Sequence, residues 1–311
     1  MKEIELVIQA IFPVIIYIGI GFFLRAQQFF KEEGWHAVEK LAYYVLFPAL
    51  IIYELATAKF SDMSFYNAAV ALNVALLVMF LLSFGAWIIK DMNGPKFTSI
   101  VQNNIRWNSY VVIGVTSALF PEYRSIVVLA IASMIPTANI LSVWSLLFWG
   151  KPEVGKKLDP VTGLIRNPLI LACLIGGLLQ FYKIPLIDPF GKTFEMLGLS
   201  VMPLGLMAVG AGLDIENMKD NTASRMFWGF VRLVGLPSLA LLSCYIFGVY
   251  DRDMIMIILI ATSAPTATNG YILARQLGGD APFMASLVGT TTLFSVITIP
   301  AMIFLFNFFI K

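Results

Sequence analysis

Long apolar stretches separated by short polar intervals dominate the chain. A helix needs about 20 mostly apolar residues to cross a hydrocarbon core of roughly 30 Å, so we expect ten membrane-spanning helices. They are predicted at residues 4–24, 35–58, 65–89, 97–120, 125–149, 164–182, 194–213, 223–249, 253–275 and 281–310. The first stretch lacks a small-residue cleavage site, so it is interpreted as a retained helix. The longest polar interval, residues 150–162, is too short for a folded domain, which places the function within the membrane.

Composition agrees with a protein whose solvent is the bilayer. Hydrophobic residues make up 59% of the 311 residues and charged residues only 13%, about half the charged share of a soluble domain. The net charge of +2 comes without a basic run, so no nucleic-acid partner is expected. We therefore predict an all-α, multi-pass protein of a cell membrane, either a plasma membrane or a bacterial inner membrane.

Positive residues are more frequent in the loops that follow the odd-numbered stretches. Those loops hold Arg25, Lys31, Lys40, Lys90, Lys96, Lys151, Lys156, Lys157, Arg166, Lys219, Arg225 and Arg275. The opposite side holds Lys2, Lys59, Arg124, Lys183, Lys192, Arg252 and Lys311. Because positive charge accumulates on the cytoplasmic side, both termini are predicted to be non-cytoplasmic.

An internal repeat relates the two halves of the sequence. A shift of 155 residues aligns Pro13 with Pro168, Gly21 with Gly176 and Pro48 with Pro203, and a shift of 161 aligns Asn108 with Asn269, Tyr110 with Tyr271 and Pro121 with Pro282. Because five is an odd number, the second copy of a five-helix repeat enters the membrane from the side opposite to the first copy. The pattern therefore predicts the inverted repeats that many secondary transporters have.

The centre of the fourth stretch is unusually polar, since it contains Gln102, Asn103, Asn104, Arg106 and Asn108. An arginine near the bilayer centre costs about 3 kcal/mol, so Arg106 should face a protein interior or a wet cavity. No acidic residue lies in the middle third of any stretch, because Glu39, Glu54, Glu195 and Asp214 all lie toward helix ends. A bound anion is therefore the expected partner of Arg106. The alternative is a structural clamp that binds backbone carbonyls.

The repeat equivalent in the ninth stretch contains Pro265, Thr266, Thr268 and Asn269. Proline interrupts the helical hydrogen bonds there, which a membrane tolerates only inside protein or beside a cavity. Two interrupted helices at matching positions predict a central anion site, because the N-termini of half-helices carry partial positive charge. Predicted substrate-binding residues are Asn104, Arg106, Asn108, Asn139, Pro265, Thr266, Thr268 and Asn269, with Asn73, Gln102, Asn103 and Arg232 as supporting residues.

Simpler interpretations stay open for several of these positions. Asn73 and Asn139 could simply join neighbouring helices by hydrogen bonds. Arg232 could instead reach the cytoplasmic interface with its long side chain. His36, the sole histidine, is interpreted as a solvated interfacial side chain, so no metal site is predicted.

Five short motifs follow one another in order along the chain: Arg106-Trp-Asn108-Ser109, Ile135-Pro136 with Asn139, Arg166-Asn-Pro168, Met202-Pro203-Leu-Gly205, and Ala264-Pro265 with residues 269–273. In these motifs the chain resembles the auxin efflux carrier family of membrane transporters. The resemblance implies two inverted halves, crossing broken helices four and nine, and small organic anions such as malate, malonate or auxin as substrates. It also implies binding by Asn108 and Asn269, with Asn139 nearby. Trp107 and Tyr110 replace the small glycines that are common beside the helix-four asparagine, which indicates a narrower or aromatic-lined pocket.

The resemblance further implies a scaffold and a moving transport domain. Scaffold helices are expected at residues 1–60 and 164–215, transport-domain helices at 61–150 and 216–311, and a cytoplasmic loop at 151–163. The predicted function is elevator-type transport of an organic anion, with an anion channel or a non-transporting anion receptor as alternatives. No nucleophile, paired carboxylate or histidine cluster suggests an enzyme, and no cofactor is expected. The coupling ion, H⁺ or Na⁺, stays open, and a homodimer through the scaffold is a hypothesis.

Overall fold

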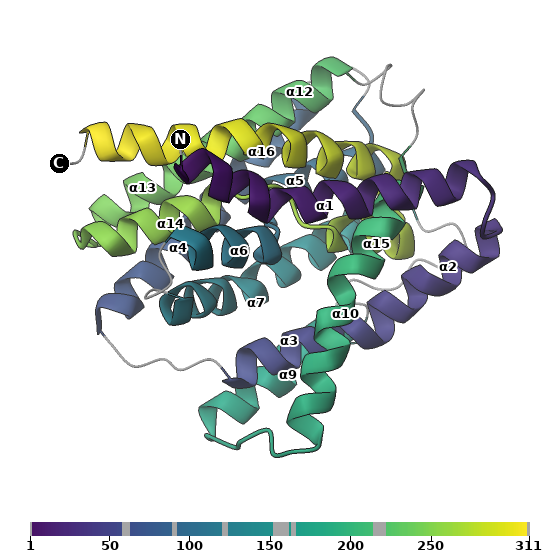
Figure 1. Cartoon of the computed structure of the whole chain (residues 1–311), viewed down its shortest axis with the longest axis horizontal. Coiled ribbons are helices and arrows are strands. Elements are labelled where there is room, and N and C mark those ends of the chain that lie inside the picture. Colours follow the sequence, from purple (N-terminus) through teal and green to yellow (C-terminus); the bar gives the residue numbers. More distant parts are fainter. Residues whose placement is uncertain are drawn as a thin grey trace.

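Every secondary-structure element of the described residues is a helix (Figure 1). The computed structural model describes residues 2–57, 63–88, 92–119, 124–151, 162, 166–213 and 222–309. The first half contains α1 (Lys2–Ala26), α2 (Glu32–Leu41), η1 (Ala42–Leu46), α3 (Phe47–Thr57), α4 (Met63–Ser83), η2 (Phe84–Ile88), α5 (Gly94–Ile105), α6 (Ser109–Leu119) and α7 (Arg124–Trp149). The second half contains α9 (Pro168–Phe181), α10 (Phe190–Ala211), α12 (Thr222–Phe230), η4 (Val231–Gly235), α13 (Leu236–Ile246), α14 (Arg252–Ser263), α15 (Asn269–Leu277) and α16 (Ala281–Phe309). Most of the predicted loop at 151–163, together with Pro121, lies outside the described residues.

Several helical runs have the length and composition of membrane spans. Among the described residues, five runs qualify: Glu32–Thr57, Tyr66–Ile88, Phe190–Ala211, Thr222–Ile246 and Ala281–Phe308. Shorter apolar helices are Phe12–Ala26, Ser133–Trp149 and Pro168–Phe181. Many large apolar side chains on these helices are exposed, as expected for surfaces that face lipid.

Two of the long runs contain a short π-helical segment at matching places. In the run Glu32–Thr57, η1 is followed by Pro48, and in the run Thr222–Ile246, η4 is followed by Pro237. Proline has no N–H and its ring clashes with the carbonyl four residues earlier, which is Tyr44 in one run and Leu233 in the other. The wider π turn accommodates this clash, so both helices continue past the proline.

Close helix packing fixes the group formed by α1, α3, α9 and α10. Helix α1 packs across one end of α10, and α3 packs against both α9 and α10 (Figure 1). A Cβ atom on Gly21 of α1 would lie 2.0 Å from the backbone oxygen of Met207, and one on Gly210 of α10 would lie 2.0 Å from that of Ile18. Glycine at both positions therefore allows the two helix backbones to touch.

Two non-helical segments lie against each other in the interior. One follows α5, with Arg106 in an extended conformation, and the other follows α14, with Ala264 extended. The Asn108 N–H donates a 2.8 Å hydrogen bond to the Pro265 carbonyl, and the Thr266 hydroxyl donates one of 2.8 Å to the Asn103 carbonyl. The segments thus satisfy one another's backbone groups where helical hydrogen bonds are missing.

Candidate functional site

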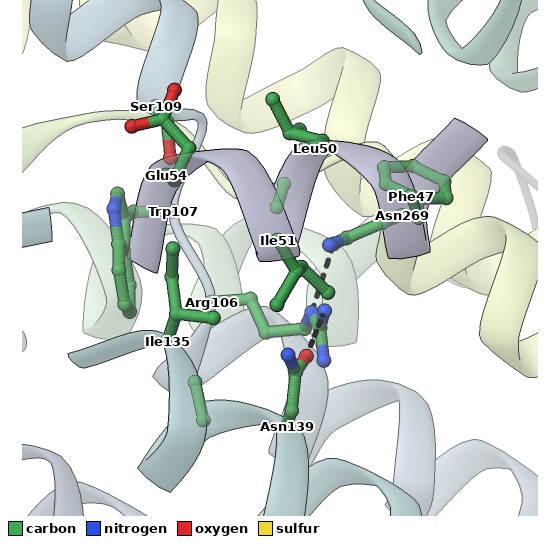
Figure 2. A pocket seen from close by; sticks show the side chains of 12 residues that line it. Phe47, Leu50, Ile51, Glu54, Arg106, Trp107, Ser109, Ile135, Asn139 and Asn269 are labelled. Atoms are coloured by element: carbon green, nitrogen blue, oxygen red, sulfur yellow. Dashed lines mark hydrogen bonds between the residues drawn. The ribbon is translucent and has the colours of Figure 1, made fainter. Parts of the chain in front are cut away.

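A small, partly open cavity lies between α3, α7 and the two non-helical segments (Figure 2). Its volume is about 80 Å³. Its lining consists of Phe47, Leu50, Ile51, Glu54, Arg106, Trp107, Ser109, Ile135, Ala138, Asn139, Ala267 and Asn269. Most of these side chains are apolar, so the few polar groups determine what the cavity can bind.

Arg106 carries the positive charge of this cavity and is only 3% exposed. Its Nε donates a 2.9 Å hydrogen bond to Oδ1 of Asn269, and its Nη2 donates one of 2.8 Å to Oδ1 of Asn139 (Figure 2). Its Nη1 is buried and has no hydrogen-bond partner, and no ion pair of the described residues joins Arg106 to a carboxylate. A buried cation without a counter-charge is costly, so this guanidinium is ready to bind an anion.

The N-termini of two helices add to the positive potential at the cavity. Ser109 is the first residue of α6 and Asn269 is the first residue of α15, and both line the cavity. The first turn of a helix has N–H groups without intrahelical partners and carries partial positive charge. Together with Arg106, these two helix ends favour a negatively charged ligand.

Arg232 has a different role, because it lies outside the cavity lining. It comes from η4 and is 0% exposed. Its Nε donates a 3.0 Å hydrogen bond to the carbonyl of Arg106, and its Nη1 donates one of 2.6 Å to the carbonyl of Thr262. The interpretation that Arg232 reaches the cytoplasmic interface is therefore wrong, since the side chain is buried and donates to the carbonyl of Arg106 in one non-helical segment and to that of Thr262 in the last turn of α14.

Three of the predicted substrate-binding residues, Arg106, Asn139 and Asn269, line the cavity together. The others do not line it and lie in the surrounding packing: Asn104, Asn108, Pro265, Thr266 and Thr268. Asn104 donates to the Ser83 hydroxyl, and Asn108 accepts from the N–H of Val111. These contacts hold helices and the first turn of α6 in place.

The predicted supporting residues other than Arg232 also lie outside the cavity lining. Asn73 donates to the Ser133 carbonyl and accepts from Thr137, which joins α4 to α7. Asn103 donates a 2.9 Å hydrogen bond to the Trp228 carbonyl, and Gln102 is fully buried. These side chains connect helices around the two non-helical segments.

Sequence reasoning missed Glu54 as a cavity residue, because its position near a helix end suggested an interfacial side chain. The signal is present in the spacing of Phe47, Leu50, Ile51 and Glu54. Positions separated by three, four and seven residues share one face of a helix, and all four line the cavity. Trp107 also lines it, in keeping with the expected aromatic lining.

A second polar cluster joins α1 and α2 to α15. Glu39 is 2% exposed, accepts a 2.8 Å hydrogen bond from the Tyr271 hydroxyl and lies 3.1 Å from Nδ1 of His36. Arg275 approaches His36 Nε2 at 2.9 Å and Glu32 at 3.3 Å, and Arg25 approaches Glu32 at 3.6 Å. His36 is therefore part of a network beside a cavity of about 470 Å³, and not simply a solvated side chain.

The His36 ring has a defined arrangement in this network. An ionised carboxylate only accepts hydrogen bonds, so Nδ1–H donates to Glu39. The guanidinium of Arg275 only donates, so Nε2 is the acceptor. These two partners fix the neutral tautomer that is protonated at Nδ1.

Comparison with known proteins places the chain among membrane transporters. A protein named "Putative malonate transporter" from Rhizobium meliloti is 27% identical over 158 residues, which cover 49% of this chain and 49% of that protein. The chain thus matches about half the length of that relative. An uncharacterized transporter from Methanocaldococcus jannaschii is 21% identical over 300 residues, which cover 92% of this chain and 94% of that protein. The family model described as membrane transport protein matches residues 6–303, so the chain belongs to this auxin efflux carrier-type family of membrane transporters.

Proposed function

We propose that the protein is a secondary transporter that binds the carboxylate of a small organic anion at Arg106. The observation that carries the proposal is that Arg106 lines the cavity and that its buried Nη1 has no hydrogen-bond partner. Guanidinium nitrogens bind carboxylate oxygens in a planar geometry. Asn139 and Asn269 occupy the other two nitrogens, so Nη1 is the guanidinium nitrogen that is left for a ligand.

The size and lining of the cavity indicate a small substrate. A volume of about 80 Å³ suits a compact carboxylate in this conformation. Apolar walls from Phe47, Ile51 and Ile135 would exclude water and strengthen the interaction with Arg106. Malonate is our first candidate, because one relative bears that name, and malate is the second. Indole acetate is included in the test because the family resemblance implies it, although it is larger and has a single carboxylate.

Transport would follow an elevator-type alternating-access cycle. In this proposal α5–α6 and α14–α15 are the halves of broken helices four and nine in two inverted five-helix repeats. The scaffold comprises α1, α2–η1–α3, α9 and α10, and the remaining helices move with the substrate. The cavity wall formed by α3 supports this division, because a scaffold helix then faces a site carried by the crossing segments.

The polar cluster around Glu39 supports the same division. Its side chains come from α1 and α2 on one side and from α15 on the other. Under the positive-inside rule this cluster lies on the cytoplasmic side, with both termini on the opposite side of the cell membrane. It would hold the conformation described here and separate when the transport domain moves. A homodimer through the scaffold is part of the proposal.

Flux measurements in liposomes test this function. The purified protein would be reconstituted, and uptake of radiolabelled malonate, malate and indole acetate would be measured under imposed membrane potentials. Arg106→Gln is the test variant, and Arg252→Gln is the matched control, because Arg252 is a surface arginine that contacts Asn307 away from the cavity. Saturable uptake that is lost only in Arg106→Gln is the expected result.

Other outcomes separate the alternatives. Non-saturating flux that follows the potential without counterflow would indicate a channel. Binding without flux would indicate a receptor. Normal uptake by Arg106→Gln would overturn the proposed site, and the absence of uptake for all three anions would overturn the proposed substrates.

A further inference from the structure

One face of α3 presents three apolar side chains and one acid to the cavity. Phe47, Leu50, Ile51 and Glu54 line it, and a rise of about 1.5 Å per residue puts roughly 10 Å of helix between the first and the last of them. In Figure 2 the guanidinium of Arg106 points toward Asn139 and Asn269, whereas Glu54 lies at the other end of the cavity. The two charged ends are separated by apolar walls.

Glu54 is a half-buried carboxylate, and no hydrogen bond or ion pair to a described residue engages it. The charged groups that line the cavity are Arg106 and Glu54 themselves. Of the helices packed on α3, α9 contributes no charged residue, and Glu195 of α10 interacts instead with Tyr53, which is outside the cavity lining. Glu54 therefore lines the cavity with unused hydrogen-bonding capacity.

We propose that the site takes a dicarboxylic acid in its singly protonated form, with the ionised carboxylate on Arg106 and the protonated carboxyl on Glu54. This inference rests on the proposed transport function. The substrate's O–H donates to a carboxylate oxygen of Glu54, and one proton is shared between the two carboxyl groups. An O–H···O⁻ hydrogen bond of this kind is strong in a site that excludes water.

The same geometry rejects two other species. A dianion would place a second negative charge against Glu54 without a proton between them, and like charges in a poorly solvated site repel strongly. A monocarboxylate would leave Glu54 without a partner, which costs the desolvation of its charge. Glu54 thus selects for two carboxyl groups that carry one proton in total.

The proton travels on the substrate. Glu54 lies on α3, which belongs to the proposed scaffold, whereas Arg106 belongs to the part that moves. When the crossing segments leave α3, the hydrogen bond to Glu54 breaks, and the proton stays on the carboxyl that brought it. Glu54 ends each cycle in its starting ionisation state, so one proton accompanies each dicarboxylate.

The pH dependence of malonate uptake by proteoliposomes tests this inference. At fixed total malonate, wild-type uptake should fall roughly tenfold per pH unit once the second carboxyl is mostly ionised. Glu54→Gln should lose most of this dependence, because its amide donates to the dianion instead of accepting from the monoanion. Glu195→Gln, on an exposed glutamate of α10, is the matched control and should keep the wild-type dependence.

Competition by monomethyl malonate gives a second readout. This ester keeps one carboxylate for Arg106 and has no O–H for Glu54. It should compete poorly in wild type and well in Glu54→Gln, whose amide donates to the ester carbonyl. Malonate uptake with unchanged pH dependence in Glu54→Gln, or equal competition in both proteins, would overturn the role of Glu54 and leave the transport function intact. Absence of uptake for every organic anion would overturn both.

Discussion

The hydroxyl of Tyr271 donates a 2.8 Å hydrogen bond to the carboxylate of Glu39, which joins α15 to α2 through two buried side chains. His36 and Arg275 contact the same carboxylate at 3.1 and 3.7 Å. Three polar groups around one buried acid satisfy a charge that would otherwise be costly. In an elevator-type cycle this contact has to break, so its strength contributes to the barrier between conformations.

Tyr271→Phe should therefore weaken the conformation described here. A hydrogen bond contributes about 1 kcal/mol net, so the equilibrium should shift by roughly fivefold toward the other conformation. The rate of malonate exchange in substrate-loaded liposomes measures the effect and should rise. Tyr44→Phe is the control, because Tyr44 is exposed and removed from this contact. An exchange rate equal to that of wild type would show that the contact does not limit the cycle.

The two buried arginines should differ in what their loss does. Arg106→Gln should abolish uptake but cost less thermal stability than the loss of Arg232, because the Asn139 and Asn269 oxygens that lose its donors line the cavity, where water can replace it. Arg232→Gln should lower the melting temperature by several degrees, because the carbonyls of Arg106 and Thr262 lose donors worth about 1–3 kcal/mol each. Thermal unfolding in detergent distinguishes the two. Equal destabilisation by both substitutions would assign Arg106 a structural role.

The contact between α1 and α10 makes a prediction about stability alone. Gly21→Ala should destabilise the protein by about 1–3 kcal/mol, because the new Cβ would overlap the Met207 carbonyl oxygen. Gly19→Ala, two residues earlier on the same helix, should be tolerated, because no atom lies within 4 Å of the added Cβ. Melting temperatures of the two purified variants provide the comparison, and similar values would argue against close backbone packing.

The helical, membrane-embedded class of the protein follows from the sequence, because each long apolar stretch indicates a helix that is buried in lipid or in the protein core. Arg106 was identified for the same local reason, since no lipid-facing helix tolerates it. Glu54 was not, because whether an acid near a helix end faces water or a cavity depends on which helix packs beside it. The alternative that Arg232 reaches the cytoplasmic interface was wrong for a similar reason. It rested on the seven residues that separate Arg232 from Arg225, but tertiary packing buries the Arg232 side chain completely.

The roles of individual asparagines also could not be predicted from the sequence. Asn104 and Asn139 are both buried amides near the two non-helical segments. Asn104, however, donates to Ser83, whereas Asn139 accepts from Arg106. An asparagine that joins helices differs from one that lines the cavity only in the direction of its side chain. Such directions depend on the contacts between helices and not on the local pattern.

Asn139→Asp places a permanent counter-charge where the substrate carboxylate is proposed to act. Oδ1 of Asn139 accepts from Nη2 of Arg106 at 2.8 Å, and aspartate has nearly the same shape. The pair should neutralise Arg106, so the melting temperature should rise while malonate uptake falls at least tenfold. Asn73→Asp is the matched control, because the Asn73 amide donates to the carbonyls of Ala69 and Ser133 and a carboxylate there should only destabilise. If Asn139→Asp transports malonate normally, Arg106 does not require the charge of an anion, and its unpaired Nη1 has another purpose than substrate binding.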